Sequence, residues 1–438
     1  MPGVLLFGDG DRATGAGHQV RLAAIADALT ARGLDVRLAC RDLPGSTHAW
    51  AWRDRPTLLL DPSLDPDQAV AEARAGFAAV VIDHYAVRRA PGCIAISDGP
   101  GLGPPAGAAL AVCPRPGASA DELPGVATIA GAAYLPLRSA FARRRGPLPD
   151  GPVLVAIGAT DPGGLVPRIA AALARPVLTL PGGEEAAVVA ERLAGCSAAV
   201  VSASTIALEC LALGLPTVAV VSVPNQEHLA AGLAGLGVEV LRPEGLAGLP
   251  AALARTVVPD AIDGGGAGRI AERIDELARW PVGSCLRWAR WDDAGHLLDW
   301  ANDPAARQAS FRSDPIPRDG HLAWFARTLG DPHSRIWIGE VEGQAVGTVR
   351  LTREGTAATV SIAVAPEARG RGAGRRLLAD LAGWVAATGF ARTLIAWVKD
   401  GNPASLRLFS GCGWPVAGQA PVAGSPATRY ELTVEPAR

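Results

Sequence analysis

One long apolar stretch limits the folds open to this chain. Residues 196–223 read CSAAVVSASTIALECLALGLPTVAVVSV, which is long enough to be mistaken for a membrane span. Glu209, Gly214 and Pro216 divide it into two short apolar runs with a helical segment between them. Strands that are apolar on both faces and joined by a helix are typical of a parallel sheet covered by helices. The stretch therefore predicts a buried strand, helix and strand of a soluble α/β domain.

The same alternation extends over most of the sequence and predicts three domains. Short apolar runs such as VVID (80–83) and CIAI (93–96) alternate with helical patterns in the first third. The segment RRRGPLPDGP (143–152) is charged and rich in Pro and Gly, as linkers are. A second α/β block ends at Trp280, and eight of the eleven tryptophans lie beyond residue 285. We expect domains at 1–145, 146–282 and 283–438.

Composition excludes several classes of protein. The net charge of −2 and the charged fraction of 19% provide no basic field for nucleic acid. The seven cysteines are scattered without a CxxC pair, so we expect neither a disulfide framework nor a metal site. Asp9 and Asp11 interrupt the first apolar run, so we expect no signal peptide. These features predict a cytoplasmic protein without a membrane span, a metal or a nucleic-acid partner, and they leave the oligomeric state open.

The segment GAGHQVRLAAIADAL, residues 15–29, places a titratable ring at the start of a helix. The apolar run Val4–Phe7, a loop and helically spaced apolar residues predict strand, loop and helix. Helix N-termini present free amides and a positive dipole end, which Gly15 and Gly17 would let a phosphate approach. The same dipole disfavours an imidazolium, so His18 is a candidate proton acceptor. The alternative is a solvated loop histidine.

The second block contains a similar candidate half-site. In AAVVSASTIALEC an apolar strand is followed by Ser204 and Thr205 at the start of a helix, with Glu209 one turn further on. Small hydroxyl residues would cap the helix and leave its amides free for a diphosphate, while the carboxylate would hold ribose hydroxyls. The alternative is an ordinary N-cap with a solvated glutamate. The two half-sites would face each other across a cleft between domains, where ligands commonly bind.

Six segments of the first 280 residues resemble, in sequence and order, the UDP-sugar hydrolases of pseudaminic acid biosynthesis. They are residues 15–29, VVIDHYAV (80–87), GAAYLPLR (131–138), IGATDPGGL (157–165), STIALECLALGLPTVAVVSVPNQ (204–226) and IDGGGAGRIAERI (262–274). The resemblance implies two Rossmann-like α/β domains that face a cleft, as in glycosyltransferases of the B type. It also implies hydrolysis of UDP-2,4-diacetamido-2,4,6-trideoxy-β-L-altropyranose to the free sugar and UDP, with inversion and with water as acceptor.

The resemblance also assigns roles to individual residues. It implies that His18 activates water and that the Gly15–Gly17 loop and the start of the second-domain helix hold the diphosphate. The positions implied around the sugar and nucleotide are Arg21, Asp83, Tyr85, Tyr134, Thr160, Ser204, Thr205, Glu209, Asn225 and Gln226. Where the family has Gly-Ser-Thr-Thr-Trp-Glu, this chain has Ser-Thr-Ile-Ala-Leu-Glu at 204–209, which leaves the identity of the sugar open.

The last block contains a different glycine-rich loop. Residues 360–385, VSIAVAPEARGRGAGRRLLADLAGWV, predict strand, loop and helix, with amides free to bind a pyrophosphate at the helix N-terminus. The pattern resembles motif A of the GNAT acetyltransferases, and NPASLRLFSGCGW (402–414) resembles their later pantetheine segment. The resemblance implies a GNAT α/β domain that uses acetyl-CoA. The cofactor-binding residues that it implies are Val364, Arg369, Gly370, Arg371, Gly372, Ala373, Gly374, Asn402 and Ser405.

Two segments before that loop indicate the acetyl acceptor. LLDWANDPAARQASF (297–311) and GHLAWF (320–325) resemble acetyltransferases that act on UDP-4-amino-4,6-dideoxy sugars. The alternative is a Trp-rich core with a solvated His321. Phe409 stands where many GNAT enzymes have a tyrosine acid, and the general base is unassigned beyond His321 as a candidate. The nucleotide-sugar pocket that the resemblance implies is lined by Trp300, Asn302, Arg307, Ser310, His321 and Trp324.

Together the resemblances predict a bifunctional enzyme in which the acetylated UDP-sugar is the substrate of the hydrolase. Three alternatives stay open. The first half could be a glycosyltransferase with a sugar acceptor, because a fold does not fix a function. The last domain could acetylate a protein N-terminus or another small amine. The chain could also be an inactive nucleotide-sugar sensor, although a base at His18 would add nothing to a binding module.

Overall fold

A computed structural model describes residues 3–10, 17–98, 103–142, 145–157, 161, 163–180 and 184–437 of the chain. The chain divides into two compact units. The first comprises Met1–Ser119 and Ala130–Ile274, and the second comprises Ala120–Ile129 and Asp275–Arg438. A short segment from the first third of the sequence therefore belongs to the C-terminal unit. The three domain boundaries inferred from the sequence stay a prediction.

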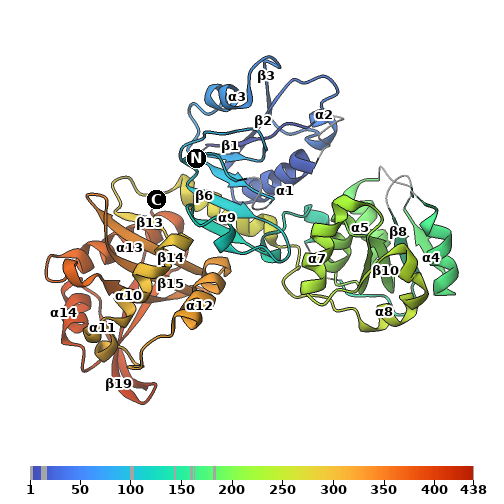
Figure 1. Ribbon diagram of the computed structural model, residues 1–438. Coiled ribbons are helices and arrows are strands. Elements are labelled where there is room, and N and C mark those ends of the chain that lie inside the picture. The colour runs from blue at the N-terminus through green and yellow to red at the C-terminus, as the bar shows by residue number, and fades with distance from the viewer. Residues whose placement is uncertain are drawn as a thin grey trace. The chain divides into compact units, whose positions relative to one another are not determined.

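The first 130 residues form a seven-stranded sheet in the order β3-β2-β1-β4-β5-β6-β7 (Figure 1). Strand β1 pairs in parallel with β2 on one side and with β4 on the other, so the winding of the chain reverses at β1. Open α/β sheets bind ligands at the carboxyl ends of the strands where this reversal occurs. The elements are β1 (Gly3–Phe7), α1 (Gly17–Ala31), β2 (Asp35–Arg41), α2 (His48–Ala51), β3 (Thr57–Leu60), α3 (Pro66–Ala73), β4 (Ala79–Ile82), β5 (Ile94–Ile96), β6 (Leu110–Cys113) and β7 (Thr128–Ala130).

A five-stranded sheet follows, in the order β12-β11-β10-β8-β9. The long apolar stretch forms β10, α6 and β11, and the two strands pair in parallel, as its pattern predicted. The elements are β8 (Val153–Ala156), α4 (Leu165–Leu173), β9 (Val177–Thr179), α5 (Ala186–Ala194), β10 (Ala198–Ser202), α6 (Thr205–Ala212), β11 (Thr217–Val220), α7 (Glu227–Gly235), β12 (Val240–Leu241), α8 (Leu249–Arg255) and α9 (Gly266–Ala278).

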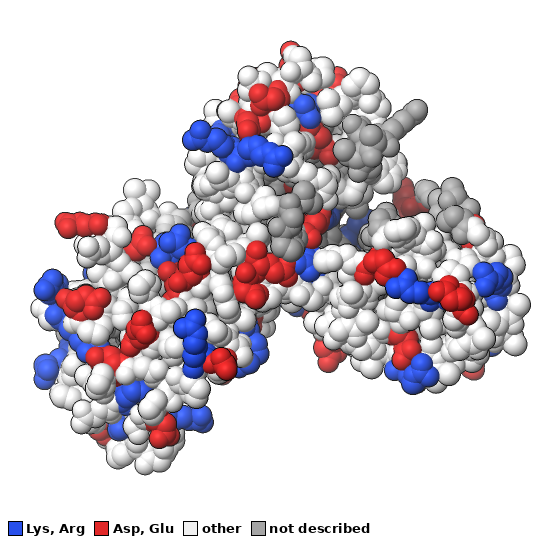
Figure 2. Space-filling model, in the orientation of Figure 1, with Lys and Arg blue, Asp and Glu red and all other residues white. Residues whose placement is uncertain are grey.

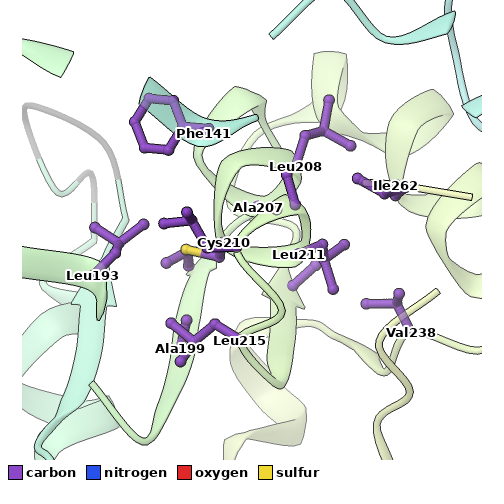
Figure 3. Packing of buried hydrophobic residues seen from close by; sticks show 14 of the residues in the cluster. Phe141, Leu193, Ala199, Ala207, Leu208, Cys210, Leu211, Leu215, Val238 and Ile262 are labelled. Atoms are coloured by element: carbon purple, nitrogen blue, oxygen red, sulfur yellow. The ribbon is translucent and has the colours of Figure 1, made fainter. Parts of the chain in front are cut away.

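The apolar face of α6 lies in a core that also receives residues from before the second sheet. Figure 3 shows Phe141 in the same cluster as Leu208, Cys210 and Leu211, and these four side chains are almost fully buried. Close backbone contact requires a glycine at Gly266, where a Cβ would lie 2.1 Å from the Leu135 carbonyl oxygen. The predicted α/β unit thus depends on a segment that the sequence pattern alone does not connect to it.

The second unit contains a seven-stranded sheet in the order β13-β14-β15-β16-β17-β19-β18. All neighbouring pairs are antiparallel except β16 and β17, which are parallel. The elements are β13 (Leu286–Trp288), α10 (Ala294–Asn302), α11 (Pro304–Ala309), α12 (Arg318–Gly330), β14 (Ser334–Val341), β15 (Gln344–Glu354), β16 (Ala357–Val364), α13 (Ala373–Thr388), β17 (Thr393–Lys399), α14 (Pro403–Gly411), β18 (Val416–Val422) and β19 (Ser425–Thr433).

Strands β16 and β17 separate after a short paired segment. Their register joins Ala357–Thr359 to Thr393–Ile395, and the rest of β16 makes no ladder with β17. The backbone groups of Val360–Val364 that face β17 are therefore available to a ligand. This opening leads directly into the glycine-rich loop before α13.

A buried ion pair connects the last turn of α9 to the sheet of the second unit. Arg335 on β14 donates two hydrogen bonds of 2.9 and 2.6 Å to Glu276 Oε1 through Nε and Nη2, and the two side chains are 1% and 3% exposed. Trp280 contacts Trp288 and Trp384 edge to face beside it, with ring centroids 4.9 and 6.4 Å away. The end of α9 is thus part of the second unit's core.

The surface agrees with the modest charge of the sequence. Figure 2 shows Lys and Arg interspersed with Asp and Glu on the face in view, with uncharged areas between them. Within the described ranges, no helix is long and apolar enough to cross a membrane.

Candidate functional site

His18 and Asp83 meet at the point where the winding of the first sheet reverses. His18 is the second residue of α1, and Asp83 directly follows β4, the neighbour of β1. His18 Nδ1 lies 2.6 Å from Asp83 Oδ1, and the residues are 6% and 0% exposed. A carboxylate only accepts hydrogen bonds, so Nδ1 donates its proton to Asp83. The lone pair is then on Nε2, which makes no hydrogen bond to any described residue.

Arg21 lies one turn along α1 and holds two carboxylates. Its Nε and Nη2 donate to the two oxygens of Asp83 at 2.9 and 2.8 Å. Its Nη1 and Nη2 donate to the two oxygens of Asp98 at 2.5 and 3.1 Å. Such forked pairs fix both distance and plane. Arg21 therefore holds in place the carboxylate that orients His18.

Asp98 was not among the residues predicted from the sequence. It follows β5 in CIAISD much as Asp83 follows β4 in VVID, and this parallel is the signal that could have revealed it. Burial would raise the pKa of Asp98, but the nearby Arg21 charge outweighs it and holds that pKa below its ordinary value. Asp98 is thus a carboxylate at neutral pH.

Tyr85 closes the cluster on its exposed side. Its hydroxyl donates to Asp98, and its ring meets the His18 ring edge to face with centroids 4.4 Å apart. Burial and Asp98 raise the pKa of Tyr85 to about 12, so the phenol keeps its proton. Because Tyr85 is 45% exposed, it is the member of the cluster that a ligand can most readily contact.

A second His and Asp pair, also missed in the sequence, supports the turn that carries Tyr85. His84 Nε2 donates to Asp9 at 3.1 Å, and its Nδ1 accepts from the Ala86 amide at 3.1 Å. Asp9 also accepts from the backbone amide and guanidinium of Arg41. Burial alone would raise the pKa of Asp9, but the bonds from His84 and Arg41 outweigh it and hold that pKa below its ordinary value. Both nitrogens of His84 are occupied, so it has a structural role.

The second predicted half-site differs in detail from its expected geometry. Ser204 is the N-cap residue of α6, but its side chain makes no cap hydrogen bond because Oγ pairs with Ser202 Oγ at 2.9 Å. The expected side-chain cap is therefore wrong, and the first amides of α6 have no cap from this side chain. Glu209 is 3% exposed and accepts from Arg138 at 2.7 Å, so the alternative of a solvated glutamate is also wrong. Burial raises the pKa of Glu209 despite Arg138.

The other predicted residues of the first unit lie in several places. Gly17 is exposed at the start of α1, Tyr134 is buried in the 3₁₀ turn Ala132–Tyr134, and Thr205 is the first residue of α6. Gln226 Oε1 accepts from the Ser222 amide at 2.8 Å. Gly15, Thr160 and the Asn225 side chain lie outside the described residues.

The glycine-rich loop of the second unit leads into α13 as its sequence predicted. Gly370 and Gly372 have φ of +73° and +84°, a conformation that favours glycine, and Gly372 is the N-cap residue. Glycine has no side chain to cap the amides of Ala373 and Gly374. Arg369 donates to the Val364 carbonyl at 3.3 Å and pairs with Asp303 at 2.8 Å, and Arg371 is exposed.

Asn402 and Ser405 bond to each other at the start of α14. The Asn402 side chain accepts from the Ser405 amide at 3.1 Å and donates to Ser405 Oγ at 2.9 Å. Phe409 on the same helix is buried and stacks on Tyr430, with centroids 5.6 Å apart. Tyr430 Oη lies 3.1 Å from Ser410 Oγ, so the phenol nearest to Phe409 is already engaged.

The predicted acceptor residues divide into core residues and residues that shape a loop. Trp300 is 6% exposed and packs in the core cluster of α10, α12 and β14. Asn302 donates to and accepts from Ile316 at 3.0 and 2.8 Å. Arg307 donates to the Ala301 carbonyl and to Ser310 Oγ, so both residues hold the segment between α10 and α12.

His321 and Trp324 lie on α12. His321 is 3% exposed, and its Nε2 donates to the Ala294 carbonyl at 2.9 Å, so the alternative of a solvated histidine is wrong. Burial lowers the pKa of His321 and favours the neutral ring. Trp324 is half-buried, and the guanidinium of Arg350 lies over its ring at 5.3 Å from the centroid.

Comparison with known proteins identifies the second unit. Residues 297–414 match the Acetyltransferase (GNAT) family, and this segment is a GNAT acetyltransferase domain. GNAT acetyltransferases use acetyl-CoA and act on an amine, so the two predictions of an acetyl-CoA cofactor and an acetyltransferase activity are confirmed at this level. A search of curated proteins found no match to the chain.

Three solved structures each resemble about a third of the chain. A spermidine N-acetyltransferase from Vibrio cholerae, in complex with CoA and spermine, is 19% identical with a TM-score of 0.31 and covers 34% of this chain and 94% of its own. An N-acetyltransferase from Staphylococcus aureus is 27% identical with a TM-score of 0.31, and the match covers 34% of this chain and 98% of that one. An acetyltransferase from Salmonella typhimurium, solved with acetyl-CoA, is 24% identical with a TM-score of 0.30, and the match covers 35% of this chain and 95% of that one.

Gly374→Glu is expected to weaken acetyl-CoA binding by about tenfold or more. A Cβ at Gly374 would lie 3.1 Å from Leu408 and 3.3 Å from Val364, and the added carboxylate would repel the pyrophosphate. Titration calorimetry with acetyl-CoA measures the change. Gly383→Glu, on the same helix, is the matched control, because a Cβ at Gly383 would meet nothing within 4 Å. Equal affinity of both variants would mean that the loop is only a turn.

Proposed function

We propose that the chain is a bifunctional nucleotide-sugar enzyme of the pseudaminic acid type. In this proposal the first unit hydrolyses UDP-2,4-diacetamido-2,4,6-trideoxy-β-L-altropyranose, and the second N-acetylates the UDP-4-amino-4,6-dideoxy precursor. The acetylated product of the second reaction is the substrate of the first. The observation that supports the hydrolase most directly is the 2.6 Å bond between His18 and Asp83 at the reversal point of the sheet.

The proposed hydrolysis uses one base. Nε2 of His18 accepts a proton from water while the water oxygen attacks the anomeric carbon from the face opposite UDP. The bond from that carbon to the diphosphate oxygen breaks, its electron pair leaves with UDP, and the sugar is released with inverted configuration. Asp83 stabilises the imidazolium that forms, because its oxygen accepts the Nδ1 proton.

Charges around His18 support this role. Asp83 and Asp98 carry two negative charges against the single positive charge of Arg21, so the cluster offsets the charge that His18 gains with its proton. The leaving diphosphate needs hydrogen-bond donors rather than an acid, and the proposed donors are the amides at the start of α6 and those of Gly15 to Gly17. Two parallel sheets in one unit agree with the proposed B-type glycosyltransferase architecture.

The proposed acetyl transfer relies on how the protein positions the amine and the thioester of acetyl-CoA. The free amine attacks the thioester carbonyl of acetyl-CoA, the carbon–sulfur bond breaks, and the thiolate leaves and takes a proton. The pyrophosphate of acetyl-CoA rests on the amides at the start of α13, and the unpaired part of β16 faces the pantetheine. The neutral ring of His321 has Nδ1 as its lone-pair nitrogen, which keeps it the candidate base.

The decisive experiment offers both UDP-diacetamido sugars, altro and bacillosamine, to the protein and follows UDP release by chromatography. A separate assay offers the UDP-4-amino precursor with acetyl-CoA. Release of UDP in water with no sugar acceptor distinguishes a hydrolase from a glycosyltransferase. Binding of both UDP-sugars without release would mean that the first unit is a sensor.

Asp98→Asn is expected to slow UDP release by roughly tenfold to a hundredfold with little change in KM. The amide keeps the shape of the side chain but removes one of the two charges that hold Arg21, so Asp83 and His18 lose their fixed geometry. Asp61→Asn is the control, because the Asp61 side chain accepts its bonds from Ser63 at the surface. Equal kcat for the two variants would exclude Asp98 from the site.

A further inference from the structure

Arg350 is an unusual residue of the acetyltransferase sheet. It lies in the middle of β15, and its side chain makes no hydrogen bond or ion pair within the part of the chain that the structure describes. Its guanidinium carbon lies 5.3 Å from the centroid of the Trp324 ring. None of its nitrogens is a fully buried atom without a partner, so water reaches the guanidinium. Burial lowers the pKa of Arg350, and no carboxylate offsets this effect. Its N–H donors are therefore held in place and available.

The strand register places Arg350 on the face of the sheet covered by α10 and α12. Arg350 pairs with Ile336 on β14, and Ile336 belongs to the core cluster of those helices. Its neighbours Val349 and Leu351 are fully buried on the opposite face. The glycine-rich loop and α13 lie on that opposite face, where Leu377 of α13 contacts the sheet. Arg350 thus faces away from the helix whose start holds acetyl-CoA.

Arg350 also adjoins the opening in the sheet. Its partner on β16 is Ser361, two residues beyond Thr359, the last residue of β16 that pairs with β17. An amine that attacks a thioester in this opening approaches beside Arg350. Two other cations of the neighbouring strands β17 and β19 already have partners: Arg429 pairs with Glu431, and Lys399 donates to the Gln308 carbonyl.

We propose that Arg350 binds an oxyanion of the acetyl acceptor, so that the acetyltransferase acts on anionic amines, with phosphate or carboxylate as the shared chemistry. Trp324 holds the guanidinium plane, and the N–H fork engages the oxyanion in two hydrogen bonds. The inference rests on the acetyltransferase half of the proposed function alone: there the diphosphate of the UDP-amino sugar is the oxyanion. An unpaired guanidinium also disfavours polycationic acceptors by like-charge repulsion.

The test compares paired amines that differ in one oxyanion, with the full-length protein and thiol release as the readout. The pairs are a UDP-4-amino-4,6-dideoxy sugar and its free amino sugar, glucosamine 6-phosphate and glucosamine, and leucine and leucinamide; spermidine is the polycation. Variants are Arg350→Gln and the charge-preserving Arg350→Lys. Arg353→Gln is the matched control, because Arg353 lies on the same strand, on the opposite face, with its guanidinium over Phe390.

Wild type is expected to prefer the oxyanion member of at least one pair. Arg350→Gln is expected to raise the KM for that member by about tenfold or more, while the KM values for the neutral member and for acetyl-CoA stay unchanged. Arg350→Lys is expected to restore part of the loss. A wild-type preference for spermidine or for the neutral members overturns the proposal even if the variants fail to fold. If glucosamine 6-phosphate or leucine depends on Arg350 and the UDP-sugar is not acetylated, the inference stands and the proposed function fails.

Discussion

Replacement of His18 by Asn is expected to lower the rate of UDP release by about 10² to 10⁴ and to change substrate affinity only a few fold. The size of the effect is that of a positioned general base. Asn can still donate a hydrogen bond to Asp83 from its amide, so the bond at 2.6 Å has a substitute and the cluster with Arg21 is kept. What is lost is the lone pair of Nε2.

The measurement is steady-state UDP release, with affinity determined separately by calorimetry. His48→Asn is the control, because His48 lies on α2 of the same unit and its Nδ1 pairs with Ser46 Oγ and not with a residue of the cluster. We expect that control to stay within twofold of wild type. If the rate of UDP release by His18→Asn stays within tenfold of the wild-type rate, His18 is not the base.

Glu276→Ala is expected to destabilise the second unit by about 3–5 kcal/mol, the usual cost of removing one partner of a buried ion pair. The Arg335 guanidinium is 1% exposed and would keep its charge without its carboxylate. Denaturant unfolding followed by tryptophan fluorescence reports on this unit, because eight of the eleven tryptophans lie beyond residue 285.

The double variant Glu276→Leu with Arg335→Met separates the ion pair from mere packing. It removes both charges and keeps similar volumes, so we expect it to be closer to wild type than Glu276→Ala. A loss below about 1 kcal/mol in the single variant, as for a surface pair, would mean that the pair is solvated in solution.

Much of the fold could be predicted because local patterns specify it. The apolar runs around Glu209 gave a parallel strand pair, and the loop before Gly374 gave a strand and a helix in the predicted order. The family match at 297–414 confirms the acetyltransferase that this loop indicated. Each of these features depends on residues close together in sequence.

The features that were missed depend on contacts between distant segments. Arg21 was predicted and Asp98 was not, and the two residues are 77 positions apart, so no local pattern indicates that their side chains meet. Arg350 shows no helical or loop motif, because its importance comes from the face on which its strand places it. Glu276 lies before the predicted boundary at 282, although its partner Arg335 lies 59 residues further along the chain.

The membership of Ala120–Ile129 in the second unit has a consequence for synthesis of the chain. The 3₁₀ turn Ala120–Glu122 contacts α12, and Ala120 shares a core with Phe325. At about 5–20 residues per second, the ribosome completes α12 roughly 10 to 40 seconds after this turn. During that interval Phe325 is not yet available to pack on Ala120. This part of the second unit's core can therefore be completed only after α12 has been made, with a segment synthesised long before it.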